Sequence, residues 1–251
     1  MSNQSRWLVY LSASKLEAHK QWVKAGFTGT GRLIVSERNL SKATIPGVGL
    51  MSAKFVKCNL SSTNFRGGDL TGIELLECTW EGAKLELSTL DQAIINNCRF
   101  SGAFLYVVHF VGTDIQGGDW SKADLHRSDW TNAQVQEVSF LETRFQETKV
   151  NDAHFTSCNF RHTSFVGATA YNTIFEYCDF RFADLTNLLL NNTTFYKCGF
   201  YGCTGIPKME GLCKIVEPDL SEQFNGSKVV SPSELFELWG LRNKPNVIVL
   251  Q

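Results

Sequence analysis

The sequence predicts an all-β solenoid, a rod in which the chain repeats one coil many times. Three observations lead to this fold class. Apolar residues recur every five positions, small residues stand two positions before them, and residue types are sorted again every 20 positions. A period of five fits neither the 3.6-residue turn of an α-helix nor the alternation of an ordinary strand. We therefore expect closed coils, each with four five-residue sides.

The five-residue repeat runs from Leu40 to Phe200 without a break. Every residue at a step of five in this range is apolar. Most of the residues that stand two positions earlier are small, namely Ala, Thr, Cys, Ser or Gly. Each side thus offers one large and one small residue to the inside of the coil. The other three residues of the side are expected to point outward.

The 20-residue order supports four sides per coil. Coils stacked about 4.8 Å apart would place residues 20 positions apart in one column. We interpret the cysteine column as compact apolar filling, because no pair has the short spacing of a zinc site and a reducing cytosol disfavours disulfides. One column contains six of the eight cysteines, and another contains only Trp and Phe: Cys58, Cys78, Cys98, Cys158, Cys178 and Cys198; Trp80, Phe100, Trp120, Phe140, Phe160, Phe180 and Phe200.

The repeated motif is a small residue, a polar residue and then Leu or Phe, as in Ala123-Asp124-Leu125 and Cys178-Asp179-Phe180. This motif resembles the pentapeptide-repeat family. The resemblance covers about residues 36–202 and implies a right-handed quadrilateral β-helix of about eight coils. It also implies a class of partner, because some pentapeptide-repeat proteins act on DNA gyrase and topoisomerase IV and protect them from quinolones or from peptide and natural-product poisons. This chain lacks the projecting loops of the well-known quinolone-resistance members.

Residues 1–35 are expected to form an N-terminal cap. Ser14 and Glu17 have the spacing of a capping box, and Gly26 is a typical helix stop, so we predict a helix over about 15–25. Its apolar face would contain Leu16, His19 and Val23. Repeat stacks need atypical end units to cover the open core.

Residues 203–251 are expected to form a C-terminal cap, because the five-residue phase is lost after Phe200. Ser231-Pro232-Ser233-Glu234 predicts a second helix start, with Pro at the first helical position. The helix would carry Leu235, Leu238 and Trp239. This apolar face is either a lid on the core or the interface of a homodimer, and one helix could serve both roles.

Other classes of function find little support in the sequence. No apolar run has the roughly 18–20 residues of a membrane span, and no signal peptide is recognisable, so we expect a cytoplasmic protein without a membrane partner. No phosphate loop, HExxH motif or nucleophile elbow occurs, and the histidines of the repeat fall on outward positions. A filled prism also offers no cleft. We expect no enzyme, no cofactor and no metal site.

Charge is distributed unevenly along the chain. The net charge of −1 excludes a globally basic nucleic-acid binder, yet acidic side chains outnumber basic ones more than twofold between positions 69 and 152. By the 20-residue rule, eight of the acids fall on two adjoining outer faces. We call this set the acidic stripe. One face carries Asp69, Asp91, Asp129 and Asp152, and the next carries Glu74, Glu77, Asp114 and Glu137.

The acidic stripe has two interpretations. It is a solvated face that keeps the rod soluble, or it imitates the charge and shape of duplex DNA and binds a basic DNA-binding saddle. Joined to the resemblance, the second interpretation predicts a DNA mimic that binds DNA gyrase or topoisomerase IV and protects it from poisons, without contacting nucleic acid itself. The alternative is a rigid scaffold or adaptor unrelated to topoisomerases, whose partner site would be an outward apolar patch at Phe104, Tyr106 and Val107, with Leu87 nearby.

Overall fold

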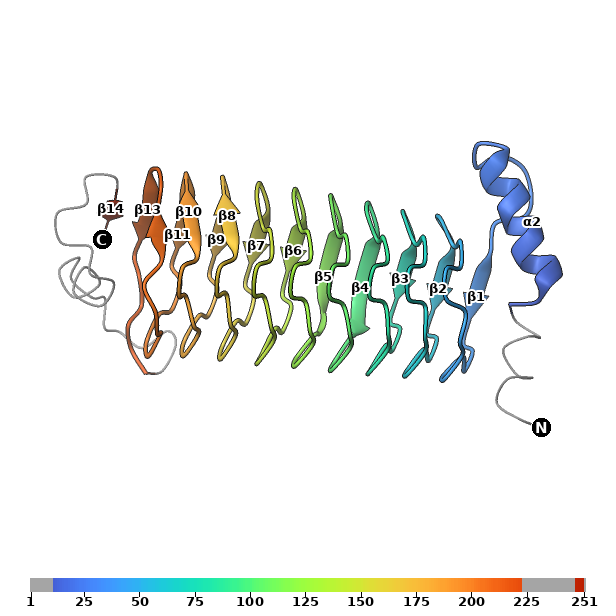
Figure 1. The fold of residues 1–251 in the computed structure, drawn as a ribbon, viewed down its shortest axis with the longest axis horizontal. Helices are drawn as coiled ribbons and strands as arrows, with labels where there is room; N and C mark the ends of the chain where they lie inside the picture. Colours follow the sequence, from blue (N-terminus) through green and yellow to red (C-terminus); the bar gives the residue numbers. More distant parts are fainter. Residues whose placement is uncertain (1–10, 223–246, 251) are drawn as a thin grey trace.

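The chain folds into a parallel β-solenoid, seen in a computed structural model that describes residues 11–222 and 247–250 (Figure 1). Coils stack along one axis, with the N-terminal helix at one end and the C-terminus at the other. The elements are α2 (Ala13–Lys24), β1 (Ile34–Ser36), β2 (Lys54–Val56), β3 (Glu74–Leu76), β4 (Ile94–Arg99), β5 (Asp114–Asp119), β6 (Gln134–Gln136), β7 (His154–Thr156), β8 (Thr169–Tyr171), β9 (Ile174–Glu176), β10 (Leu189–Asn191), β11 (Thr193–Tyr196), β12 (Lys208–Met209), β13 (Cys213–Val216) and β14 (Val247–Leu250).

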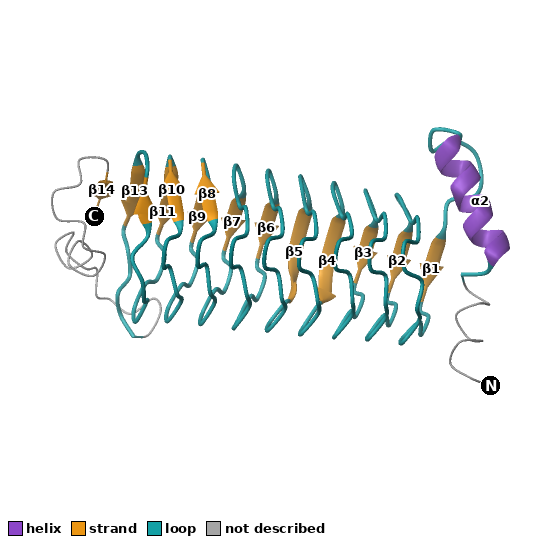
Figure 2. Ribbon diagram, viewed as in Figure 1, coloured by secondary structure: helices purple, strands orange, loops and turns teal. Residues whose placement is uncertain are grey.

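Every coil has four faces, which we number in chain order. Face 1 carries the 11-stranded sheet β1-β2-β3-β4-β5-β6-β7-β9-β11-β13-β14, and face 4 carries the sheet β12-β10-β8. On faces 2 and 3, successive coils are joined by single parallel bridges, such as Asn59↔Thr79 on face 2 and Lys84↔Phe104 on face 3. Figure 2 shows that most of each coil is turn and that the strands are short. An unbroken series of parallel pairings leads from β1 to β13. In each pairing the partners are 20 residues apart, as Val35 is opposite Phe55. The predicted four-sided coil is confirmed.

The core fills the whole length of the rod. Every predicted inward centre from Leu40 to Phe200 is buried except Ile45, which is partly buried. In the aromatic column, Phe140 stacks on Phe160 with ring centroids 5.1 Å apart, and Phe160 stacks on Phe180 at 5.0 Å. Such aromatic pairs contribute roughly 0.5–1.5 kcal/mol beyond the area they bury. The cysteines are all buried and free, as the filling interpretation predicts.

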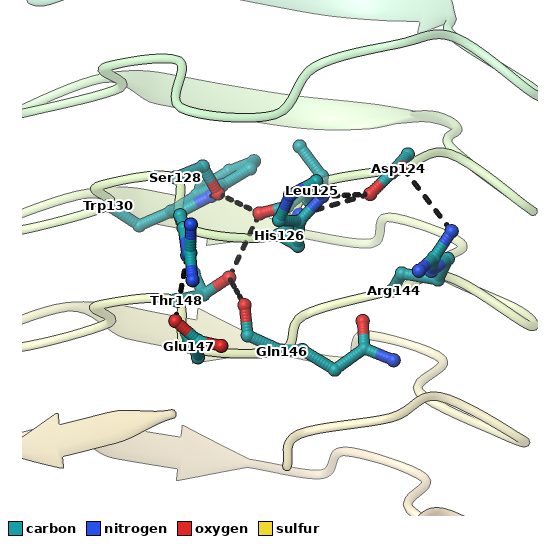
Figure 3. Close-up of polar contacts among 10 residues, drawn as sticks. Asp124, Leu125, His126, Ser128, Trp130, Arg144, Gln146, Glu147 and Thr148 are labelled. Carbon is teal, nitrogen blue, oxygen red and sulfur yellow. Dashed lines mark hydrogen bonds and ion pairs between the residues drawn. The ribbon is translucent and has the colours of Figure 1, made fainter. Parts of the chain in front are cut away.

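Small inward hydroxyls are satisfied by the backbone of the coils (Figure 3). Ser128 donates to the carbonyl of Leu125 at 2.6 Å and accepts the indole N–H of Trp130 at 2.8 Å. Thr148, one coil later, donates to the same Leu125 carbonyl at 2.9 Å. A buried hydroxyl without a partner would be costly, so the carbonyl makes Thr and Ser acceptable where Ala and Cys otherwise stand.

One coil differs from its neighbours where the cysteine column is interrupted. At Gly118 the backbone has a φ of +108°, and an added Cβ would collide with the carbonyl oxygen of Cys98. Both β4 and β5 are longer here, and Cys98 pairs with Gly118 across them. A side chain is therefore excluded at this position.

The N-terminal helix starts earlier than predicted. Its N-cap is Ser12, whose hydroxyl accepts the Lys15 N–H at 3.3 Å, so the predicted capping box at Ser14 is wrong. Glu17 instead accepts from the Gln21 side chain at 2.6 Å. The predicted stop is confirmed, because Gly26 has a φ of +71° and the Phe27 N–H bonds the Trp22 carbonyl.

Helix α2 lies at the N-terminal end of the rod, with Trp22 and His19 buried (Figure 1). The His19 Nδ1 atom accepts the backbone N–H of Leu33 at 3.0 Å, just before β1. Burial holds the pKa of His19 below its ordinary value. Of the predicted apolar face, Leu16 packs partly buried against the core, whereas the contribution of Trp22 was not predicted.

The solenoid continues beyond the point at which the sequence loses its phase. β10 pairs with β12 one residue out of the regular register, with Leu190 opposite Met209, and β11 and β13 return to it, with Phe195 opposite Ile215. One residue is therefore missing before β12 and one is added before β13. The offset between the two coils shortens by one residue at Pro207, which is buried. Residues 203–219, which we assigned to the C-terminal segment, thus form one more coil. The predicted helix with Leu235, Leu238 and Trp239 lies outside the described residues.

Candidate protein-interaction surface

The acidic stripe lies on faces 4 and 1, over the middle of the rod. On face 4, Asp69 and Asp129 occupy bridge positions, as Asp69↔Thr89 and Asp129↔Lys149. On face 1, Glu74 begins β3 and Asp114 begins β5. All eight acids point away from the core, because the inward positions of their sides are taken by the residues of the hydrophobic core.

Three of the acids occupy coil corners. Glu77, Glu137 and Asp152 have positive φ angles of 53°, 57° and 56°, which L-residues adopt at some cost. Each corner N–H donates to a carbonyl of the next coil, for example Asp152 to Tyr171 at 2.7 Å. This hydrogen bond stabilises the corner, and the corner directs the carboxylate outward.

Three of the eight acids are neutralised by cations of neighbouring coils. Glu74 pairs with Arg32 at 2.6 Å and with Lys54 at 2.8 Å. Hydrogen bonds from these two side chains hold the pKa of Glu74 below its ordinary value. Glu77 pairs with Lys57 at 3.7 Å. These charges join coils and contribute little net charge to the surface.

Asp129 is the third neutralised acid. Its carboxylate lies 3.3 Å from the Lys149 ammonium and accepts hydrogen bonds from Thr131. Burial acts to raise the pKa of Asp129, but the Thr131 and Lys149 hydrogen bonds outweigh it, and the pKa is lowered.

Five acids remain without an ion pair among the described residues: Asp69, Asp91, Asp114, Glu137 and Asp152. Several accept hydrogen bonds that fix them without cancelling their charge. Asp91 accepts the Val111 N–H at 2.8 Å, and Asp152 accepts the Asn172 side-chain amide at 2.9 Å. These five form the charged part of the acidic stripe, and we call them the uncompensated acids.

A polar hollow of about 220 Å³ lies within face 1. It extends across β5, β6 and β7, and Asp114 is the uncompensated acid on its wall. His154, opposite, lies 3.2 Å from Glu176. The hollow is open to solvent, and its apolar lining residues are Ile115 and Val135. Its polar side chains are Asp114, Gln116, Gln134, Gln136, His154 and Thr156.

Faces 2 and 3 differ in that most of their acids are paired over the same coils. Lys122 pairs with Glu142 at 3.7 Å, and Arg127 pairs with Glu147 at 2.7 Å. Asp124 accepts from Arg144 at 3.4 Å and contacts His126 at 2.7 Å. The charge asymmetry of the rod therefore results from pairing as well as from composition.

The sequence and the geometry now agree on the family. The family model described as Pentapeptide repeats matches eight copies, over residues 39–72 and 139–176. This chain contains pentapeptide repeats and is similar to that family. No curated protein matches its sequence.

Several solved structures resemble this chain. HetL, from the cyanobacterium Nostoc, is 14% identical over 81% of this chain and 91% of its own, with a TM-score of 0.30. Full-length QnrB1, a plasmid-mediated fluoroquinolone resistance protein, is 14% identical over 84% of this chain and 100% of its own, with a TM-score of 0.37. A pentapeptide repeat protein from the thylakoid lumen of Arabidopsis thaliana is 25% identical over 49% and 68%, with a TM-score of 0.23. At these scores the likenesses carry no functional information.

The predicted apolar patch lies on face 3. Leu87 is 50% exposed and Phe104 is 45% exposed, whereas Tyr106 and Val107 are half-buried. Tyr106 stacks on His126 with ring centroids 5.2 Å apart. The predicted residues therefore do lie together on the outside, with Leu87 and Phe104 the most exposed of them.

The described part of the chain also bears on metal sites and membrane spans. Residues 11–222 and 247–250 bring together no cluster of three His, Cys, Asp or Glu side chains suited to a metal ion. Within the same ranges, no helix has both the length and the apolar character needed to cross a membrane. The family model belongs to a structural repeat and indicates no enzyme family.

Sequence reasoning missed the cations and amides that shape the acidic stripe. The amides that line the hollow, Gln116, Gln134 and Gln136, were not singled out, and neither was the pairing of Arg32 and Lys54 with Glu74. Reading each outward column at steps of 20 would have found the Lys54–Glu74 and Lys149–Asp129 pairs. Arg32 precedes the repeat, so no column reading would have found it.

Proposed function

We propose that this rod is a non-enzymatic DNA mimic that binds the basic DNA-binding saddle of DNA gyrase or topoisomerase IV and protects the enzyme from antibiotic or toxin poisons. The observation that carries the proposal is the set of uncompensated acids on faces 4 and 1. They are spread along the middle coils, and most of the acids on the other two faces are paired. The partner class comes from the resemblance of the repeat to topoisomerase-protecting family members.

The charge density sets the strength of the interaction. From Asp69 to Asp152 the chain advances by about four coils, or roughly 19 Å at 4.8 Å per coil. Five charges over this length amount to about one per 4 Å, against one per ~1.7 Å in duplex DNA. The mimic is therefore less charged than DNA, and its binding should weaken steeply as salt screens the surface.

The hollow at Asp114 gives the same surface its hydrogen-bonding capacity. Amide side chains from neighbouring coils surround this carboxylate, and they offer both donors and acceptors to a partner. A basic saddle could pair its cations with the uncompensated acids and bond these amides without needing an apolar contact.

The test is gyrase supercoiling and topoisomerase IV decatenation, with and without a poison, at low and physiological salt. We expect the full-length protein to change enzyme activity or poison sensitivity at low salt and to lose this effect as salt rises. For the triple variant Asp91→Lys, Asp114→Lys, Asp152→Lys, the protein concentration needed for the same effect should rise at least about tenfold.

A matched control reverses three acids on the other faces: Glu81→Lys, Glu142→Lys and Glu147→Lys. It alters net charge equally but leaves the uncompensated acids intact, and it should keep the effect. Equal loss in both triple variants would assign the effect to net charge and contradict mimicry by this surface. No effect of the unaltered protein on either enzyme would favour the alternative, a scaffold unrelated to topoisomerases.

A further inference from the structure

Face 3 contains a buried acid whose charge is not balanced within the described part of the chain. Glu86 is only 9% exposed, and its Oε2 atom is shielded from solvent without a hydrogen-bond donor. Among the described residues its carboxylate makes no ion pair. The nearest cations in the repeat are Lys84, two residues earlier, and Arg66, one coil earlier, and both are exposed. A buried carboxylate oxygen without a donor is costly, so the retention of an acid here needs a reason.

Exposed apolar side chains surround this acid in the repeat. Leu87 follows it directly, and Phe104 lies one coil later, where it pairs by backbone with Lys84. Tyr106 takes the position of Glu86 in that next coil. An acid of this kind within an exposed apolar patch is typical of an interface whose partner supplies the missing donor.

A network of side chains adjoins the patch on face 3, and Figure 3 shows its part from Asp124 to Gln146. Tyr106 stacks on His126, with ring planes 17° apart. His126 is fixed by Asp124, which also holds Arg144. One coil further, the side-chain oxygen of Gln146 is a second buried acceptor without a donor. The same column thus contains two unfilled acceptors, one on either side of a stacked ring pair.

Local cations do not fill these acceptors. Arg127 is engaged by Glu147, and Arg144 is engaged by Asp124. Arg66 and Lys84, the cations nearest Glu86 in the repeat, are exposed and make no ion pair with it. A partner can therefore supply the donor, and its chemistry is defined by the surroundings. A guanidinium fits a carboxylate with two parallel hydrogen bonds and also stacks on an aromatic ring, which an ammonium does less well.

We propose that face 3 docks an apolar segment of a protein partner, which places an arginine on Glu86 and against Phe104 and Tyr106. Leu87 and Val107 form the apolar rim around this contact. The site lies opposite face 1 and beside face 4, and it shares no residue with the acidic stripe. It leaves the rod able to hold two partners at once, and its failure would leave the proposed DNA mimicry untouched.

The test uses labelled synthetic peptides in which one arginine is flanked on both sides by Leu and Val. Binding to the full-length protein is measured by fluorescence anisotropy, and the contacted amides are mapped by NMR. We expect the arginine peptide to bind and to perturb the amides of Leu87 and Tyr106. A citrulline peptide, which has the same shape without the charge, should bind at least about tenfold more weakly.

Variants locate the contact. Glu86→Gln should weaken arginine-peptide binding at least about tenfold, and Phe104→Ser should do the same. The matched controls are Glu142→Gln on face 2 and Ile174→Ser on face 1, which should bind as the unaltered protein does. Circular dichroism melts will establish whether each variant is folded. The melting temperature of Glu86→Gln should be no lower than that of the unaltered protein, because the acid has no ion pair to lose.

Four results would overturn the proposal. These are no binding of the arginine peptide, equal binding of the citrulline peptide, unchanged binding by Glu86→Gln, or tighter binding of a peptide with glutamate at the central position. The last would mean that Arg66 and Lys84, and not Glu86, govern the recognition at this face.

Discussion

Two parts of the acidic stripe differ in whether their carboxylates are paired with cations. In the first coils, Glu74 and Glu77 are paired with cations and tie neighbouring coils together. In the middle coils, Asp91, Asp114 and Asp152 have no cationic partner among the described residues. The difference teaches that a count of acids overstates a binding surface, because part of the charge is used within the rod.

The largest expected effect tests the structural role of the first coils. Glu74→Lys would place a third cation beside Arg32 and Lys54, and we expect it to lower the free energy of unfolding by about 2 kcal/mol. Urea unfolding followed by circular dichroism measures this. Asp114→Lys, in the middle coils, should change the same quantity by less than about 0.5 kcal/mol. A similar loss of unfolding free energy in both variants would contradict the difference between the first and the middle coils.

The second effect is a dependence on pH. The pKa of Glu74 is lowered in the folded protein, so its stabilisation is present above the ordinary glutamate pKa of about 4.3 and is lost as the pH falls through the folded value. Glu74→Gln should therefore lose about 1 kcal/mol at pH 7 and little at pH 3. Urea midpoints between pH 7 and pH 3 measure it. A constant difference across this range would contradict the assignment.

The third effect concerns the middle coils and should be close to zero. Asp114→Asn removes a charge that has no cation to pair with among the described residues, so stability at pH 7 should stay within about 0.5 kcal/mol. A salt titration sharpens the test, because removing an uncompensated acid should also reduce the salt dependence of stability. A loss above about 1 kcal/mol would mean that this acid, too, has a structural role.

The smallest effect compares the interiors of the two parts, which we expect to behave alike. The cysteines of the early and late coils are all buried. Burial raises the pKa of Cys158 and Cys178 well above the ordinary value and that of Cys213 to about 12. A thiol reagent should find no fast-reacting cysteine in the native protein at pH 8 and all eight after unfolding. A reactive thiol in the native protein would show that part of the column is open.

The interior could be predicted from the sequence because it is set by a strict period. The five-residue period determines which residues face inward. The 20-residue period then determines which residues stack in one column. The same rule assigned the eight acids to the two outer faces that the structure has as faces 4 and 1. It failed at Pro207, where one residue is lost just before β12 and regained before Cys213.

The exterior could be predicted less well, because its energetics depend on which neighbours a long side chain reaches. The Arg32–Glu74 pair joins residues 42 positions apart, from outside the repeat to its third strand. The burial of Glu86 on an outward position likewise has no signal in the period. The helix start at Ser12 was missed because two serines compete for the cap, and only the structure decides between them.

The constant register from one coil to the next limits how such a rod can change in size. A coil is removed or added in register only as a whole unit, so the molecule grows and shrinks by fixed increments of about 4.8 Å. Duplication of one coil would lengthen both the surface of faces 4 and 1 and that of face 3 by the same amount. The number of coils therefore determines the length of the rod and the length of each of its outer faces.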